Sequence, residues 1–291
     1  MNRCNLCPRR CNAERTENTN IGGFCKMPSL PRIAKACLHF WEEPCISGKD
    51  GSGTVFFSGC SLRCVFCQNY KLSHDGYGKT ISYQRLAEIF RELEEKGANN
   101  INLVNPTHYV DAIKKALEIY TPKIPIVYNC GGYDDESVAN LDFVDVYLFD
   151  LKFYDDEKSL KYAAAKNYFE IAAKVIKKAH DRIGKPEFSK DGIMQKGVII
   201  RHLLLPSATN DAIKIIDWAS ENCKNTVFSL MSQYLPYGDA CKFKELSRRV
   251  TDREYEKVVN HLLNKNFYNS YIQERSSSSE EYIPIFDCEG V

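Results

Sequence analysis

Three cysteines with short, uneven spacing are the residues of this chain best suited to chemistry. Cys60, Cys64 and Cys67 are separated by three and then by two residues. Three thiolates at this spacing can hold three irons of a [4Fe–4S] cluster, which leaves the fourth iron open to another ligand. A zinc loop or a set of buried structural thiols is the alternative, although zinc typically takes two close pairs of ligands. The spacing favours a cluster with an open iron.

A second group of cysteines lies near the N-terminus. Residues 1–50 contain six of the 13 cysteines and four prolines, with almost no helical periodicity. We therefore expect a small, loop-rich lobe over residues 1–50 that is stabilised by metal because it buries little apolar surface. The expected ligands are Cys4, Cys7, Cys11 and Cys25, with Cys37 and Cys45 as further candidates. Four thiolates saturate a structural site, for which zinc is favoured over iron–sulfur.

The elements that must position the Cys60–Cys67 group follow the lobe. Short apolar runs alternate with amphipathic segments from Thr54 onward, which is typical of βα units. The predicted strands are 54–57, 101–104, 124–128, 144–149, 197–205 and 226–230, and the predicted helices include 82–96, 158–183 and segments starting near 110, 210 and 251. Six right-handed units predict an α/β fold, a partial (β/α)6 barrel over residues 51–291, with an open doubly wound sheet as the alternative. In both folds the chemistry lies at the carboxyl ends of the strands, where Cys60 follows the first one.

The spacing Cys60-x-x-x-Cys64-x-x-Cys67, with the aromatic Phe66 before the last cysteine, resembles the signature of radical S-adenosylmethionine (SAM) enzymes. Residues 56–70 and the segment Asp150-Leu151-Lys152 resemble the pyruvate formate-lyase activating enzymes, especially their cysteine-rich PflX-like branch. The resemblance covers nearly the whole chain, including the lobe and residues 283–287. It implies an oxidoreductase in which a [4Fe–4S] cluster reductively cleaves SAM, and the resulting 5′-deoxyadenosyl radical abstracts hydrogen. In the narrower form, the hydrogen comes from a glycine of a glycyl-radical enzyme.

The resemblance also implies roles for particular residues at the strand ends. Asp150 contributes to a monovalent cation site near SAM, Lys152 approaches the SAM carboxylate, and Arg201 is directed at the cofactor. Gln233, after the sixth strand, falls where relatives place a residue that reaches adenosine, and Phe66 holds the aromatic position. For Asp150 and Lys152 the alternative is a solvated strand end.

The second and third strands end in polar residues as well. Many relatives carry a Gly-Gly-Glu segment after the second strand, whereas this chain has Asn105-Pro106-Thr107-His108. The oxygens of Asn105 and Thr107 can accept the same hydrogen bonds, although these residue types are also common at helix starts. Asn129, at the end of the third strand, is a candidate for the ribose or the cation. Cys130 and His202 are expected to be packing residues.

Charge and composition limit the classes of partner and the cellular location that we expect. The 39 Lys and Arg residues balance 38 Asp and Glu residues, so we expect no binding to nucleic acid or to an anionic membrane. The polar start lacks the apolar core of a signal peptide, no segment approaches the roughly 20 apolar residues of a membrane span, and we expect a cytoplasmic protein. The implied partners are an electron donor of the flavodoxin or ferredoxin type and a glycyl-radical enzyme or other protein substrate. The alternatives are radical modification of another peptide or a small molecule, and a non-catalytic, metal-stabilised binding module.

Overall fold

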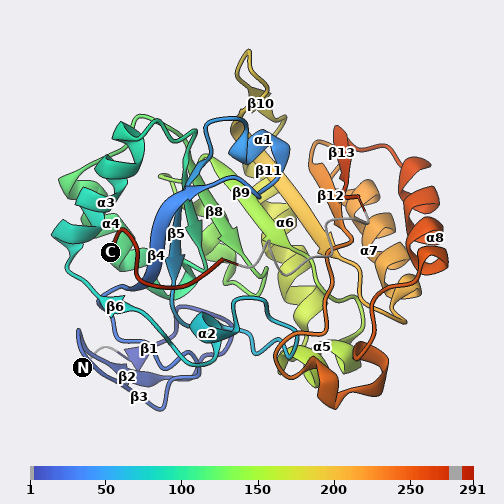
Figure 1. The fold of residues 1–291 in the computed structure, drawn as a ribbon, viewed down its shortest axis with the longest axis horizontal. Helices are drawn as coiled ribbons and strands as arrows, with labels where there is room; N and C mark the ends of the chain where they lie inside the picture. The colour runs from blue at the N-terminus through green and yellow to red at the C-terminus, as the bar shows by residue number, and fades with distance from the viewer. Residues whose placement is uncertain (1–2, 275–283) are drawn as a thin grey trace.

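A large mixed β-sheet forms the centre of the molecule (Figure 1), for which the computed structural model describes residues 3–274 and 284–291. Its strands are β4 (Arg32–His39), β5 (Ser52–Phe57), β6 (Lys79–Thr80), β7 (Ile101–Val104), β8 (Ile126–Cys130), β9 (Val146–Asp150), β10 (Glu187–Phe188), β11 (Met194–Leu203), β12 (Val227–Met231) and β13 (Asn269–Ile272). They follow the order β13-β12-β11-β9-β8-β7-β5-β4-β6, and β10 pairs with β11 beside this path. Within the described residues the end strands β13 and β6 do not pair with each other, so the barrel is partial.

The six predicted strands are all present and parallel, which confirms the expected α/β architecture. Sequence reasoning missed the other four strands of this sheet, of which β4 and β13 are the longest. β13 adds another parallel strand beside β12, and its Asn269-Ser270 start gives no apolar signal. β4 pairs antiparallel with β5, and Arg32 and Lys35 interrupt its apolar residues. Both strands extend the sheet at its edges, and Ile33 and Ala36 of β4 add to a buried core cluster.

The longer helices cover the outer face of the sheet (Figure 1). The helices of the described residues are α1 (Pro44–Ser47), α2 (Tyr70–Ser73), α3 (Tyr83–Glu95), α4 (Val110–Ile119), α5 (Asp156–Ala163), α6 (Tyr168–Ile183), α7 (Thr209–Asn222) and α8 (Asp252–Leu263), with short 3-10 helices at Thr107–Tyr109, Glu136–Asn140, Ala240–Lys242 and Lys244–Leu246. One buried cluster packs α6, α7 and α8 against β8, β9, β11 and β12. A second packs α3 and α4 against β5 and β7. None of the helices in the described part of the chain is long and apolar enough to cross a bilayer.

Local sequence signals predicted the starts of α3 and α8 correctly, but they did not reveal a break within one predicted helix. Ser82 caps α3, and Thr251 and Glu254 form the expected capping box at α8. The prediction of a single helix over 158–183 is wrong, because the chain breaks it into α5 and α6. Ala164 and Asn167 adopt left-handed backbone angles, with φ of 52° and 51°, and these end one helix and precede the next.

The N-terminal segment forms a separate small sheet. β1 (Arg3–Cys4), β2 (Ala13–Arg15) and β3 (Asn20–Ile21) pair antiparallel at one end of the large sheet (Figure 1). The division into residues 1–50 and 51–291 stays a prediction, and the pairing of β4 with β5 favours a boundary before Arg32.

The outer edge of β4 is covered by a segment from far along the chain. The Ala36 N–H donates to the Glu289 carbonyl, and the Cys288 N–H donates to the Ala34 carbonyl, both at 2.9 Å. The Lys35 Nζ reaches the Glu289 carboxylate at 2.6 Å. These bonds satisfy backbone groups that an edge strand would otherwise expose.

One tyrosine joins the carboxyl ends of two neighbouring strands. The Tyr168 hydroxyl, at the start of α6, lies 2.8 Å from the Gly131 carbonyl and 2.7 Å from the Asp150 carbonyl. It also accepts the Lys152 N–H at 2.9 Å. Because Tyr168 is fully buried, its hydroxyl fixes the backbone on both sides of the Asp150 side chain.

We predict that Tyr168→Phe lowers the free energy of unfolding by about 1–3 kcal/mol, because it leaves buried backbone groups without their partner. Urea denaturation followed by circular dichroism measures this. Tyr268→Phe, at an exposed ring, is the control for simple loss of a hydroxyl. Equal stability of the two variants would contradict the assigned role of Tyr168.

Candidate active site

The alternation of side chains along the parallel strands builds the site in two layers. Val146 and Leu148 of β9, together with Val127, Ile199 and Val227 of the neighbouring strands, form an apolar cluster inside the sheet. Cys45 and Ile46 of α1 pack into the same cluster and close that end of the barrel. Side chains two residues further along each strand share this inner face. They are Asp150, Asn129, Arg201 and Ser229, and all of them line one cavity of about 380 Å³.

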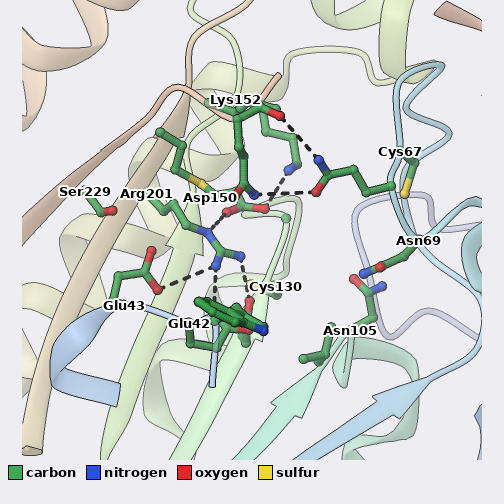
Figure 2. A pocket seen from close by; sticks show the side chains of 18 of the residues that line it. Glu42, Glu43, Cys67, Asn69, Asn105, Cys130, Asp150, Lys152, Arg201 and Ser229 are labelled. Carbon is green, nitrogen blue, oxygen red and sulfur yellow. Dashed lines mark hydrogen bonds and ion pairs between the residues drawn. The ribbon is translucent and has the colours of Figure 1, made fainter. Parts of the chain in front are cut away.

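Arg201 is the centre of a network of ion pairs and hydrogen bonds in this cavity (Figure 2). It lies directly opposite Asp150 in the pairing of β11 with β9. Its Nε donates to Asp150 Oδ1 at 2.6 Å, and its Nη2 donates to Asn129 Oδ1 at 3.1 Å. The Lys152 Nζ donates to the other Asp150 oxygen at 2.6 Å. The strand register thus brings together four of the predicted site residues.

Two glutamates that the sequence analysis did not select complete the network. Glu42 Oε2 accepts from Arg201 Nη1 at 2.9 Å, and Glu42 Oε1 accepts from Asn129 Nδ2 at 3.2 Å. Glu43 Oε2 lies 3.6 Å from Arg201 Nη1, and this buried oxygen has no hydrogen-bond partner. Figure 2 shows the Glu43 carboxylate directed at the guanidinium. Their position between β4 and α1 could have been found only by recognising β4 as part of the barrel.

Burial and neighbouring charges set the protonation of these groups. Burial would raise the pKa of Asp150, but the Arg201 and Lys152 charges outweigh it and lower the pKa to about 2. Burial would lower the pKa of Lys152, and Asp150 reverses that direction and raises it. Burial raises the pKa of Glu43 to about 7, partly opposed by Arg201 and increased by Glu42. Asp150, Lys152 and Arg201 are therefore all charged at neutral pH, whereas Glu43 keeps its proton up to about pH 7.

The three predicted cluster ligands line the same cavity from the loop after β5. Cys60 Sγ accepts the Leu62 N–H at 3.3 Å, and Cys67 Sγ accepts the Ser73 hydroxyl at 3.3 Å. Burial raises the pKa of the Cys60 thiol to about 11, and it also raises the pKa values of Cys64 and Cys67. Thiolates are thus costly here unless a metal charge compensates them.

This donor set fits an iron–sulfur cluster with one open iron. All three thiols face one cavity, and the hydrogen bonds to Cys60 and Cys67 are of the kind that tune cluster ligands. Across residues 3–274 and 284–291, no three His, Cys, Asp or Glu side chains already converge as a metal-binding group. The ligand set therefore stays a prediction.

The remaining predicted cofactor residues divide between the cavity and its surroundings. Phe66, Asn105 and Gln233 line the cavity, and the Gln233 Oε1 accepts from Gln273 Nε2 at 2.9 Å. Thr107 lies outside this lining, and its hydroxyl donates to the buried Asp134 at 2.6 Å. This bond uses the Thr107 hydroxyl in a buried network beneath the site, which argues against a direct contact with a ligand.

The two residues expected to serve in packing are both buried. His202 directs its Nδ1 at the Leu151 carbonyl at 2.7 Å, and burial lowers its pKa. Cys130 is 3% exposed, although it also borders the cavity. Neither position adds a charge to the site.

The N-terminal cysteines form a second group in the small lobe. Cys4, Cys7, Cys11 and Cys25 are all partly buried free thiols. Burial raises the pKa of Cys7 to about 12, and negative charge on Cys4 or Cys25 would raise it further. Burial also raises the pKa of Cys25, and negative charge on Cys4 or Cys11 would raise it further. Cys37 and Cys45 belong instead to β4 and α1 of the barrel.

Comparison with known proteins agrees with this arrangement. The model of the Radical SAM superfamily matches residues 54–219, so the chain belongs to that superfamily. Membership implies a [4Fe–4S] cluster and SAM as cofactors.

The chain is similar in sequence to two further proteins and in fold to a third. The chain is 33% identical to the uncharacterized protein MJ0674 of Methanocaldococcus jannaschii, over 88% of this chain and 73% of that protein. It is 29% identical to the pyruvate formate-lyase-activating enzyme of Listeria monocytogenes, over 56% of this chain and 66% of that enzyme. Its fold is similar to that of Streptococcus suis SuiB bound to SAM, with a TM-score of 0.51, 17% identity and coverage of 74% of this chain. The chain spans about half of SuiB, 48% of its length.

The raised pKa of Glu43 predicts a pH dependence of stability. The folded chain keeps this proton up to about pH 7, whereas the ordinary pKa of a glutamate is 4.5. The unfolded state therefore binds fewer protons between these values, and stability falls as the pH rises through them, by up to about 1.4 kcal/mol per unit. We predict that Glu43→Gln removes this contribution and stabilises the chain at pH 8. Urea titrations at pH 5, 6, 7 and 8 measure it, with Glu187→Gln, at an exposed position of β10, as the control. An unchanged slope in Glu43→Gln would refute the assignment.

Proposed function

We propose that Cys60, Cys64 and Cys67 hold the [4Fe–4S] cluster and that the cavity beside them binds SAM. The observation that carries this proposal is the shared cavity, in which the three thiols meet the Arg201–Asp150–Lys152 network. A non-catalytic binding module would have no need for paired charges buried at the strand ends. When bound, the cluster supplies the electron for reductive cleavage of SAM, which yields a 5′-deoxyadenosyl radical.

The residues of the chain bind and orient the cofactor in this proposal. Arg201 uses three N–H donors on Asp150, Asn129 and Glu42, so its guanidinium is held in one orientation. The bond to Asp150 takes one of the three donors of Lys152, which makes Lys152 the better group to reach the SAM carboxylate. Phe66, Asn105 and Gln233 border the remaining space.

Two further ligands are part of the proposal. We place a zinc ion or an iron–sulfur cluster on Cys4, Cys7, Cys11 and Cys25, because their mutual electrostatic effects indicate proximity. A monovalent cation beside Asp150 would share oxygens that already accept from Arg201 and Lys152. The cysteine usage supports a cytoplasmic location, and an electron donor of the flavodoxin or ferredoxin type would reduce the cluster.

For the hydrogen donor we propose a glycine of a glycyl-radical enzyme. The similarity to pyruvate formate-lyase-activating enzymes supports this choice. The partial barrel supports it as well, since a protein loop needs a lateral opening to reach the strand ends. Modification of another peptide is the second candidate, because the SuiB structure with its precursor peptide SuiA is a case in which a chain of similar fold binds a peptide.

Two variants test the cofactor site. Cys64→Ala should lose the cluster and the formation of 5′-deoxyadenosine, because a direct iron ligand is removed. Asp150→Ala should keep its iron but bind SAM roughly ten- to a hundredfold more weakly, because Lys152 and Arg201 lose the group that orients them. Iron analysis, electron paramagnetic resonance of the reduced protein and equilibrium SAM binding measure these effects.

The matched control for the cofactor test is Cys241→Ala, at an exposed cysteine. It should retain the iron content, the spectrum and the SAM affinity of the wild type. Full iron content and cleavage in Cys64→Ala would show that the cluster lies elsewhere.

The substrate proposal has its own test. We expect that the reduced protein with SAM, incubated with glycyl-radical enzymes from the same organism, produces the doublet of a glycyl radical in electron paramagnetic resonance. The Cys64→Ala variant should give no doublet. Formation of 5′-deoxyadenosine with a peptide or small molecule, and no doublet with any candidate enzyme, would reject the activase proposal and leave the cofactor site intact.

A further inference from the structure

The N-terminal lobe contacts the Cys60–Cys67 loop through a half-buried arginine. Arg9 lies between Cys7 and Cys11 in the sequence. Its Nε donates to the Ser61 carbonyl at 2.7 Å, and its Nη1 donates to the Ala164 carbonyl. Ser61 directly follows Cys60, so one side chain connects the lobe to the start of the loop that would carry the cluster.

Arg9 also contacts backbone carbonyls at the C-terminal end of α5. α5 ends at Ala163, and its last carbonyls lack partners within the helix. Arg9 Nη2 lies 3.5 Å from the Ala163 carbonyl, so the guanidinium meets the negative end of α5. The same carbonyl accepts the Arg63 N–H at 3.0 Å. The lobe, α5 and the loop are thus bonded at one point.

A second arginine makes the reciprocal contact from the loop to the lobe. Arg63 lies between Cys60 and Cys64, and its Nη2 donates to the Phe24 carbonyl at 2.9 Å. Its Nη1 donates to the Ser73 carbonyl. Phe24 precedes Cys25, so this bond reaches a residue adjacent to a proposed lobe ligand.

Both arginines also contact the ring of Phe24. The Arg9 guanidinium is 3.7 Å from the ring centroid, and the Arg63 guanidinium is 5.2 Å from it. Both distances fall within the range of cation–π contacts. The two positive charges therefore share one aromatic ring, which holds them close in spite of their mutual repulsion.

The lobe also forms a wall behind the start of the loop. Gly59 has a φ of +84°, and a Cβ there would lie 2.2 Å from Met27 Cγ and 3.2 Å from the Cys25 carbonyl oxygen. The backbone before Cys60 therefore lies directly against the lobe, with no space for a side chain. Its conformation depends on where residues 25–27 are held.

We infer that Arg9, Arg63 and Phe24 couple the lobe to the cluster loop, so that the cysteine site of the lobe positions Cys60, Cys64 and Cys67. The lobe acts as a positioning element for the cluster, and the two arginines are positioning residues that act through their bonds to backbone carbonyls of the loop, the lobe and α5. This inference rests on the proposed function for the identity of the cluster, and the contacts themselves are independent of it.

The test compares two neighbouring arginines in the full chain, purified with its metals under anaerobic conditions. Arg9→Gln removes the bonds to Ser61 and Ala164, whereas the control Arg10→Gln removes an exposed ion pair with Asp135. We expect Arg9→Gln to speed amide hydrogen exchange of residues 59–67 and the release of iron to a chelator roughly tenfold. Arg10→Gln should stay within about twofold of the wild type. Equal exchange and iron release in the two variants would overturn the inference.

A second pair of variants keeps the test decisive if Arg9→Gln fails to fold. Arg9→Lys keeps the charge and loses the planar fork, and Phe24→Leu removes the shared ring with little change of volume. Both should raise exchange of residues 59–67, and wild-type exchange in both would overturn the coupling. The iron content of the wild type tests the proposed function separately, because the exchange measurement needs neither SAM nor turnover.

Discussion

The ion pair between Arg201 and Asp150 is the interaction on which the site depends. The pair lies across two adjacent parallel strands, directly above an apolar layer inside the sheet. Buried charges are tolerated only when they are paired and hydrogen-bonded, and loss of one partner typically costs about 3–5 kcal/mol. Lys152, Asn129 and Glu42 provide additional bonds that offset the cost of burying the pair. The positions of these three side chains therefore depend on the pair as well.

The N-terminal part of the chain completes the site from two directions. α1 closes the floor of the barrel with Cys45 and Ile46, and the residues just before it bring Glu42 and Glu43 to Arg201. The small lobe lies instead behind the loop of Cys60. A fragment limited to the matched residues 54–219 would lack both contributions, which makes the N-terminal segment a structural part of the site.

Sequence reasoning located the strands that carry the site because each is an apolar run that ends in a polar residue. Asp150 and Arg201 could both be assigned to one end of the sheet in advance, since parallel strands end at one edge, but their direct pairing is seen only in the register of β9 with β11. Glu42 and Glu43 could not, because their position follows from the antiparallel pairing of β4, which has no continuous apolar signal. The break between α5 and α6 was equally hidden, since Ala164 is a good helix former and only its tertiary surroundings impose a left-handed conformation.

The segment that covers β4 has a consequence for the order of assembly during synthesis. Lys35 of β4 and its partner Asp287 are 252 positions apart. At about 5–20 residues per second, a ribosome needs on the order of ten seconds or more to make the intervening chain. During that interval, Ala34 and Ala36 present open backbone groups to other strands in the cell. The uncovered part of β4 is therefore an edge strand that other strands can pair with until residues 287–289 have been made.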